Sequence, residues 1–257
     1  EPTPTAEATE AATPPAEPTT LPSDPAAVRV TDGLQALYTF NERRGATVRD
    51  MSGNETVLDL TIRDTASVTW TANGLTVSQP TLIISGAAPT RLIAALRATN
   101  AITLEAWIKP ANLTQEGPAR ILTLSESELA RNFTLGQGDW HQQPSDFIDV
   151  RLRTTETSEN GSPSQASAHG TLGTEITHVV YTRSADGTAR LYIDGQEQVS
   201  GQVLGDFSTW GADFQLALAN EISGDRPWLG DYYLVAVYDR ALSAEEVAQN
   251  RQAGPGA

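Results

Sequence analysis

The residues best suited to ligand recognition gather in one segment in the middle of the chain. Trp140 and His141 stand together in a glycine-rich, polar stretch, GQGDWHQQPSD. Aromatic rings of this kind can stack on the flat faces of sugars. In the strand expected next, Asp149, Arg151 and Arg153 alternate and therefore share one face. Two guanidinium groups on an exposed face would bind carboxylated sugars or an acidic protein; alternatively, they balance neighbouring acids in a solvated sheet.

Residues that could perform catalysis do not form a recognisable pattern. The histidines, His141, His169 and His178, lie far apart and lack metal-ligand spacing. No Gly-x-Ser-x-Gly elbow is present, and there is no cysteine, which excludes thiol catalysis, zinc–thiolate sites and disulfides. We therefore expect a protein that binds a ligand without transforming it.

The overall charge limits the partners. The chain has 257 residues and a formal net charge of −15, and Lys109 is its only lysine. Nucleic acid is not an expected partner, because phosphate binding requires clustered cations. The acidic surface could hold divalent cations or keep an extracellular protein soluble. No apolar run approaches the roughly 20 residues of a membrane span.

Residues 1–27 differ in composition from the rest of the chain. They consist almost entirely of Pro, Thr, Ala and Glu, and the first cation is Arg29. Such a segment cannot bury enough apolar surface to offset its chain entropy, so we expect a disordered tether ahead of one domain, residues 28–257. Because the chain starts at Glu1, we also expect a processed product that has lost an export signal. Tethers of this composition favour a secreted or cell-surface location.

The elements that would position these residues are mainly short strands. The clearest signal is Thr177–Glu197, where two alternating runs flank an Ala-Asp-Gly turn, a pattern typical of an antiparallel hairpin. The predicted strands are Ala36–Phe40, Val57–Arg63, Ser67–Trp70, Leu82–Ile84, Ile102–Lys109, Arg120–Leu124, Asn132–Gln137, Phe147–Arg153, His178–Arg183, Ala189–Ile193, Phe214–Ala219 and Tyr232–Tyr238. Their spacing predicts an all-β, two-sheet antiparallel sandwich.

Two helices interrupt the predicted strands. A short internal helix over Thr90–Ala98 places three aliphatic side chains on one face. A C-terminal helix follows Leu242, where Ser243 and Glu246 have the spacing of a capping box. We expect the C-terminal helix to seal one end of the sandwich.

Three stretches together resemble the LamG-like jelly-roll domains of the concanavalin A-like lectin/glucanase superfamily. They are GLQALYTFNERRGATVRDMSGNE from Gly33, AITLEAWIKP from Ala101, and the late pair THVVYTRSADGTARLYIDG from Thr177 and RPWLGDYYLVAVYDRALSAEEV from Arg226. The resemblance covers nearly everything after Val28. It implies a jelly roll of two curved sheets whose faces or rim loops bind sugars or proteins.

The resemblance also carries expectations about metal and catalysis. Many relatives hold a structural calcium ion between the loop after the first strand and the last strand, and Asp50 and Asp231 are the carboxylates here that could supply it. Glucanases of the superfamily carry Glu-x-Asp-x-x-Glu along one strand. That string is absent: Glu126-x-Glu128 is followed at the third place by Arg131.

These observations lead to one functional hypothesis and two alternatives. The hypothesis is a non-catalytic, exported recognition or adhesion module, with carbohydrate as the expected ligand and a cell-surface protein as the other possible partner. The first alternative is a structural spacer or assembly domain of a larger surface protein. The second is an accessory domain of a secreted carbohydrate-active enzyme, or such an enzyme with an unrecognised site.

Overall fold

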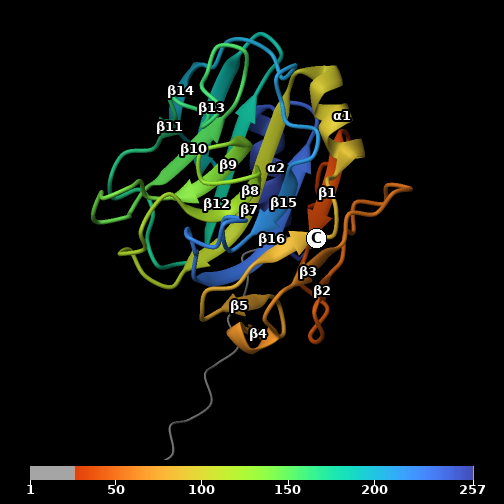
Figure 1. Cartoon of the computed structure of the whole chain (residues 1–257), viewed down its shortest axis with the longest axis vertical. Coiled ribbons are helices and arrows are strands. Elements are labelled where there is room, and N and C mark those ends of the chain that lie inside the picture. Colours follow the sequence, from red (N-terminus) through yellow and green to blue (C-terminus); the bar gives the residue numbers. More distant parts are fainter. Residues whose placement is uncertain (1–26, 257) are drawn as a thin grey trace, which may run out of the picture.

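The computed structural model describes residues 27–256 of the chain. The predicted tether, residues 1–27, lies outside this range except for Ala27. The described residues form two facing antiparallel sheets of eight strands each, with two α-helices (Figure 1). The predicted fold class, an antiparallel jelly-roll sandwich with an internal and a C-terminal helix, is confirmed.

Sheet A contains the two longest strands at its centre. Its order is β14 (Gln196–Gln202), β13 (Thr188–Ile193), β12 (Thr177–Arg183), β7 (Ile102–Pro110), β16 (Gly230–Tyr238), β5 (Leu75–Val77) and β4 (Val68–Trp70), and β1 (Leu34–Tyr38) also pairs with β16.

Sheet B faces sheet A across the core. Its order is β11 (Gln165–Ala166), β10 (Ile148–Leu152), β9 (Arg131–Gln137), β8 (Ala119–Ser125), β15 (Gln215–Leu218), β6 (Ile83–Ser85), β3 (Leu60–Ile62) and β2 (Thr47–Val48). A short 3₁₀ turn, η1 (Thr65–Ser67), precedes β4. Each of the predicted strands coincides with an observed one, whereas β2, β5, β11 and β14 were not predicted.

The predicted hairpin is formed by β12 and β13. Val179 pairs with Ile193 and Arg183 with Ala189, so the register follows the alternation in the sequence. Gly187 in the connecting turn has φ 89°, a conformation that glycine adopts without strain. A second turn, at Asp194 and Gly195, also has positive φ and leads into β14.

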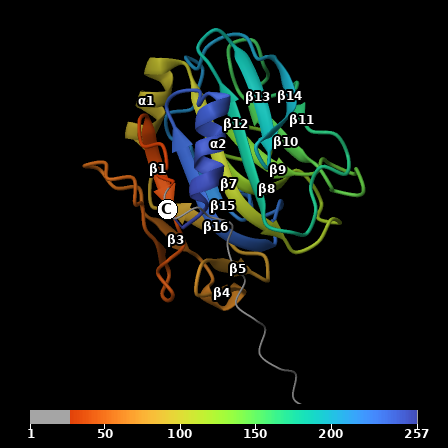
Figure 2. The same cartoon turned by 180° about the vertical axis from the view of Figure 1, so that it is seen from behind.

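Strands β7 and β16 are buried on both faces because the C-terminal helix covers the outer face of sheet A, and does not seal one end of the sandwich as predicted. This helix, α2 (Ala244–Ala253), lies across these strands in Figure 2. The capping box is present: the Ser243 hydroxyl accepts the Glu246 backbone N–H, and the Glu246 carboxylate accepts the Ser243 N–H. Because α2 covers the outer face of sheet A, Trp107 is buried there in a second hydrophobic cluster, outside the main core.

The internal helix, α1 (Thr90–Thr99), closes one end of the main core. Leu92, Ile93 and Leu96 are buried along its inward face, as the periodicity predicts. Asn100 ends the helix in a left-handed conformation, and its backbone N–H donates to Leu96 O.

A buried polar cluster joins both ends of the described chain to sheet A. The carboxylate of Glu105, on the outer face of β7, accepts hydrogen bonds from Arg29 Nη1 at 2.7 Å and Asn250 Nδ2 at 2.9 Å. It also lies 2.9 Å from His178 Nε2 and 3.4 Å from the Tyr238 hydroxyl. Burial alone would raise the pKa of Glu105, but the Arg29 charge and the His178 contact outweigh it and lower the pKa to about 2.

Candidate functional site

The outward face of sheet B carries charged side chains where β8, β9 and β10 run side by side. The register places Arg120 and Asp149 on either side of Gly136. Arg151, two residues further along β10, points to the same face as Asp149 and pairs with Thr134 of β9. Since side chains alternate along a strand, the residues between them point into the hydrophobic core.

Glycine is required at the centre of this face. A Cβ atom at Gly136 would lie 2.8 Å from Cβ of Pro118, which leads into β8. The missing side chain lets Pro118 pack directly on the sheet, and Pro118 forms one edge of a cavity above it.

The cavity has a volume of about 290 Å³ and is assembled from loops that are distant in the sequence. The β8–β9 turn, the segment after β9, the loop after β10 and the β15–β16 loop each contribute to its wall. Its polar lining consists of Arg120, Glu128, Arg151, Asn160 and Arg226, and its apolar lining adds Leu129 and Trp140 to Pro118.

Two of the most exposed large apolar side chains in the described part of the chain meet at this cavity. Leu129 is 65% exposed and Trp140 is 47% exposed. The guanidinium of Arg226 lies 4.1 Å from the centre of the Trp140 ring, a cation–π geometry that holds one indole face. Asp225 in turn fixes Arg226 through an ion pair of 2.9 Å. The half-exposed Trp140 ring is thus held in a defined orientation.

A single carboxylate links Trp140 to the arginine on the strand. Asp139 Oδ1 accepts the Trp140 backbone N–H at 2.8 Å and Arg151 Nη2 at 2.8 Å. Arg151 Nε also donates to Asp149 Oδ1 at 2.9 Å. Burial raises the pKa of Asp149, although the Arg151 charge works in the opposite direction. The aromatic ring and the guanidinium are therefore held by the same hydrogen-bond network.

Below the cavity the polar groups are fully buried. Arg120 Nε donates to Glu221 Oε2 at 2.8 Å, and the Ser125 hydroxyl donates to the other Glu221 oxygen. Arg131 is also buried, and its Nε has no hydrogen-bond partner among the described residues. Burial, assisted by the nearby Arg120 charge, lowers the pKa of Arg131 to about 9.

The predicted binding residues divide into three groups. Trp140 and Arg151 line the cavity together. Asp149 lies beneath it and orients Arg151, and His141 packs outside it, with its ring 4.4 Å from that of Trp140. Arg153 does not line the cavity; its guanidinium lies 3.3 Å from Glu159.

Of the two interpretations that the sequence left open for these arginines, the ion pairs favour the one without free guanidinium groups. Arg151 and Arg153 balance neighbouring acids, which was the alternative reading of this pattern. We also missed Arg120, Leu129, Asn160 and Arg226, because no sequence spacing connects these residues to Trp140. Only Leu129, an apolar residue in the polar turn SESELA, gave a local signal.

The predicted calcium ligands lie in different parts of the fold. Asp50 accepts three backbone N–H groups, from Leu37, Ser52 and Leu58. Leu37 pairs with Ala236, five residues along β16 from Asp231, or about 16 Å at the rise of a strand. One calcium ion, with ligands at about 2.4 Å, cannot use both carboxylates. Among residues 27–256, no three His, Asp or Glu side chains form a group that could hold a metal.

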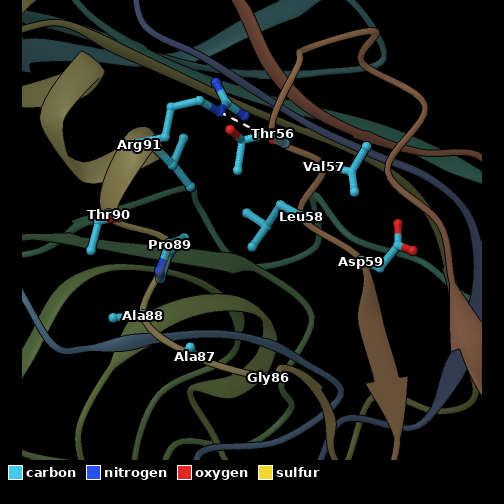
Figure 3. A pocket seen from close by; sticks show the side chains of 11 residues that line it. Thr56, Val57, Leu58, Asp59, Gly86, Ala87, Ala88, Pro89, Thr90 and Arg91 are labelled. Atoms are coloured by element: carbon cyan, nitrogen blue, oxygen red, sulfur yellow. Dashed lines mark hydrogen bonds between the residues drawn. The ribbon is translucent and has the colours of Figure 1, made fainter.

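Another cavity lies at the N-terminus of α1, between residues 56–59 and 86–92 (Figure 3). Its volume is about 220 Å³. Small and aliphatic residues make up much of its lining, and the Arg91 guanidinium bends over to donate to Thr56 O at 3.3 Å. It presents neither an aromatic ring nor a cluster of charged groups, so the cavity beside Trp140 is the better candidate for recognition.

In the part of the chain that the structure describes, no helix has the length and apolarity needed to cross a membrane.

Comparison with known proteins supports the fold independently. A family model described as "Concanavalin A-like lectin/glucanases superfamily" matches residues 85–248, which confirms the resemblance noted from the sequence. No curated protein sequence gave a match.

Three solved structures illustrate the structural similarity. Trypanosoma rangeli sialidase in complex with sialic acid aligns with a TM-score of 0.63 and 18% identity, over 90% of this chain and 35% of the sialidase. Domain 4 of AbnA, an extracellular GH43 arabinanase from Geobacillus stearothermophilus, in complex with arabinotriose, aligns with a TM-score of 0.56 and 19% identity, over 86% of this chain and 98% of the domain. The binding domain of botulinum neurotoxin serotype D/C aligns with a TM-score of 0.60 and 11% identity, over 84% of this chain and 51% of the toxin chain.

These identities are low, so the alignments establish a shared fold and nothing more. This chain spans about a third of the sialidase but corresponds to a whole domain of the arabinanase.

Proposed function

The chain belongs to the concanavalin A-like lectin/glucanases superfamily, and we propose that it is an exported, non-catalytic module that binds glycan in the cavity beside Trp140. One observation carries the proposal: a half-exposed indole ring is held in a fixed orientation at the mouth of a polar cavity. Sugars offer apolar C–H faces and polar hydroxyl edges, and both types of surface have a counterpart here.

The binding mode follows from the arrangement of the lining. A pyranose or furanose ring would pack against the exposed part of Trp140 and against Leu129, which lines the same cavity. Its hydroxyl groups would then point toward Arg151 and Asn160. Because Asp139 already fixes both Trp140 and Arg151, little side-chain entropy would be lost on binding.

A non-catalytic role is proposed because the carboxylates are not arranged for hydrolysis. Glycoside hydrolysis generally needs two carboxyl groups flanking the scissile bond. Glu128 is the one acidic residue among the described residues that line this cavity. Glu221 and Asp149 lie beneath it, and their oxygens are engaged by Arg120, Ser125 and Arg151.

The similar structures support the ligand class and the location without establishing either. The arabinanase domain, which is similar to this chain over nearly its whole length, was solved with arabinotriose bound, and its parent enzyme is extracellular. We propose by analogy that this chain is secreted or displayed on a cell surface, where polysaccharides are the available ligands.

Binding to immobilised polysaccharides and oligosaccharides, followed by calorimetry, tests the proposal. The exposed part of Trp140 offers about 100 Å² for stacking. Losing that contact should cost about 2.5 kcal/mol, or roughly 70-fold in Kd. Trp140→Ala should therefore weaken binding strongly. Trp70→Ala is the matched control, since Trp70 is partly exposed on β4 in the other sheet.

Two results would contradict the proposal. If wild type binds no glycan better than Trp140→Ala does, the cavity is not a glycan site, and the spacer or assembly role becomes the better account. If wild-type protein instead releases reducing sugar from a polysaccharide, the non-catalytic assignment fails.

A further inference from the structure

The charge around the cavity can be counted from its ion pairs. Arg120 is paired with Glu221 at 2.8 Å, and Arg226 with Asp225 at 2.9 Å. Each of these guanidinium groups is therefore already neutralised by a carboxylate of the protein.

The remaining charges do not leave an excess of cations. Arg151 has two carboxylates, Asp139 at 2.8 Å and Asp149 at 2.9 Å. Glu128 lines the cavity, and no cation of the described residues lies within ion-pair distance of it. Arg131 is the one further cation, and it is fully buried beneath the Glu128 carbonyl, which accepts its Nη2. In and beneath the cavity, the positive charges of four arginines are thus outnumbered by five carboxylates, in a protein whose net charge is −15.

The polar groups that remain available are suited to hydroxyl groups. Arg151 Nη1 and Arg226 Nη2 donate no hydrogen bond to any described residue. The oxygen of a sugar hydroxyl accepts hydrogen bonds, so adjacent hydroxyl groups can accept from these two guanidinium groups together.

We infer that this cavity selects neutral sugars, binding adjacent hydroxyl groups through Arg151 and Arg226, and that it rejects carboxylated or sulfated sugars. The inference rests on the proposed function and names its ligand class. It follows the sequence-based alternative in which the arginines balance neighbouring acids, and not the one in which they attract an acidic ligand. Here the arginines act as oriented donors, and the carboxylate of Glu128 repels a ligand anion.

The experiment compares neutral and carboxylated probes. Arabinan and galactan are the neutral probes; polygalacturonate, alginate and galactan oxidised at its primary hydroxyl groups are the carboxylated ones. Affinity is measured by calorimetry at 50 and 500 mM NaCl for wild type, Trp140→Ala and Glu128→Gln. Glu156→Gln is the charge-matched control, because Glu156 is exposed and does not line the cavity.

The expected result is Trp140-dependent binding to a neutral probe that changes less than about twofold with salt. Oxidised galactan should bind at least about fivefold more weakly than galactan, and Glu128→Gln should recover most of that loss. Glu156→Gln should not recover it.

Different failures have different meanings. Trp140-dependent binding that favours the carboxylated probes and weakens with salt would overturn the neutral-sugar inference and leave the proposed function intact. If no probe binds wild type better than Trp140→Ala, the proposed function falls, and this inference falls with it.

Discussion

The buried carboxylate of Glu105 provides the most quantitative test of how this fold is held together. Glu105→Gln keeps the size of the side chain and removes its charge. In the wild-type protein the carboxylate is completely buried and neutralises Arg29, itself only 5% exposed. The substitution therefore leaves a buried guanidinium without a counter-charge, a situation that costs about 3 to 5 kcal/mol.

The pKa of Glu105 gives a second measure of the same interaction. Its value is about 2 in the folded protein, compared with 4.5 for an ordinary glutamate. A depression of this size corresponds to about 3 kcal/mol of folding stability. The folded pKa lies below the unfolded one, so this stability is fully present above pH 4.5 and is lost as the pH falls toward 2.

Urea denaturation followed by tryptophan fluorescence, repeated from pH 7 to pH 2, measures both quantities. At pH 7, Glu105→Gln should lower the free energy of unfolding by about 3 kcal/mol. The difference between wild type and variant should narrow as the pH falls below 4.5, because the Glu105 carboxylate then binds a proton in the unfolded wild type while it stays ionised in the folded protein until about pH 2. Glu175→Gln, at an exposed glutamate, should change stability by less than about 0.5 kcal/mol.

A double-mutant cycle with Arg29→Gln separates the ion pair from the other hydrogen bonds. The double variant should be more stable than the sum of the two single losses implies, by more than about 1 kcal/mol. A loss below about 1 kcal/mol for Glu105→Gln at pH 7, or a difference that stays constant between pH 4.5 and 2, would refute the account of Glu105 as an ionised buried anchor.

Two further predictions concern the cavity and the calcium ion. Leu129→Ala should weaken binding to a neutral glycan by about threefold to tenfold in calorimetry, because it removes apolar surface at the cavity, whereas Leu204→Ala, at a similarly exposed leucine elsewhere, should not. The two carboxylates predicted to hold calcium are both engaged within the protein: Asp50 accepts three backbone N–H groups, and Asp231 accepts the hydroxyl groups of Thr76 and Tyr233. EDTA should therefore leave the Tm of wild type unchanged, and a Tm that EDTA lowers in wild type but not in Asp231→Asn would contradict this expectation.

The sandwich could be predicted because its signals are local. Alternating residues and Asp-Gly turns specify the β12–β13 hairpin within twenty residues, and the capping box specifies the start of α2. Strand β14, with the sequence QEQVSGQ, was missed because it is an edge strand with little burial on either face. Without a buried face there is no hydrophobic alternation to recognise.

The site was predictable only where residue type was informative. An exposed tryptophan in a polar loop is unusual, and this singled out Trp140. The cavity wall also needs Arg226, which lies beyond β15 and meets Trp140 only after β15 pairs with β8 and β8 with β9. That contact depends on the whole sheet order, which a single sequence does not reveal.

The error at Arg153 shows the limit of strand periodicity. Alternation correctly places Asp149 and Arg151 on one face, since both lie within β10. The Arg153 N–H still donates to Asn132 O of β9 at 2.9 Å, but its guanidinium lies 3.3 Å from Glu159 in the next loop and does not line the cavity. Alternation predicts the face to which a side chain points, but not which group a long side chain contacts there.

The pairing of Arg151 shows why the sequence left two interpretations of this strand open. A free Arg151 would favour an acidic ligand, but its partner Asp139 lies twelve residues earlier, on the loop that also carries Trp140. Folding turns the pair into one rigid unit: the carboxylate orients the ring and the guanidinium together. A site built in this way gains selectivity from the positions of its donors, because its charges are already balanced before any ligand arrives.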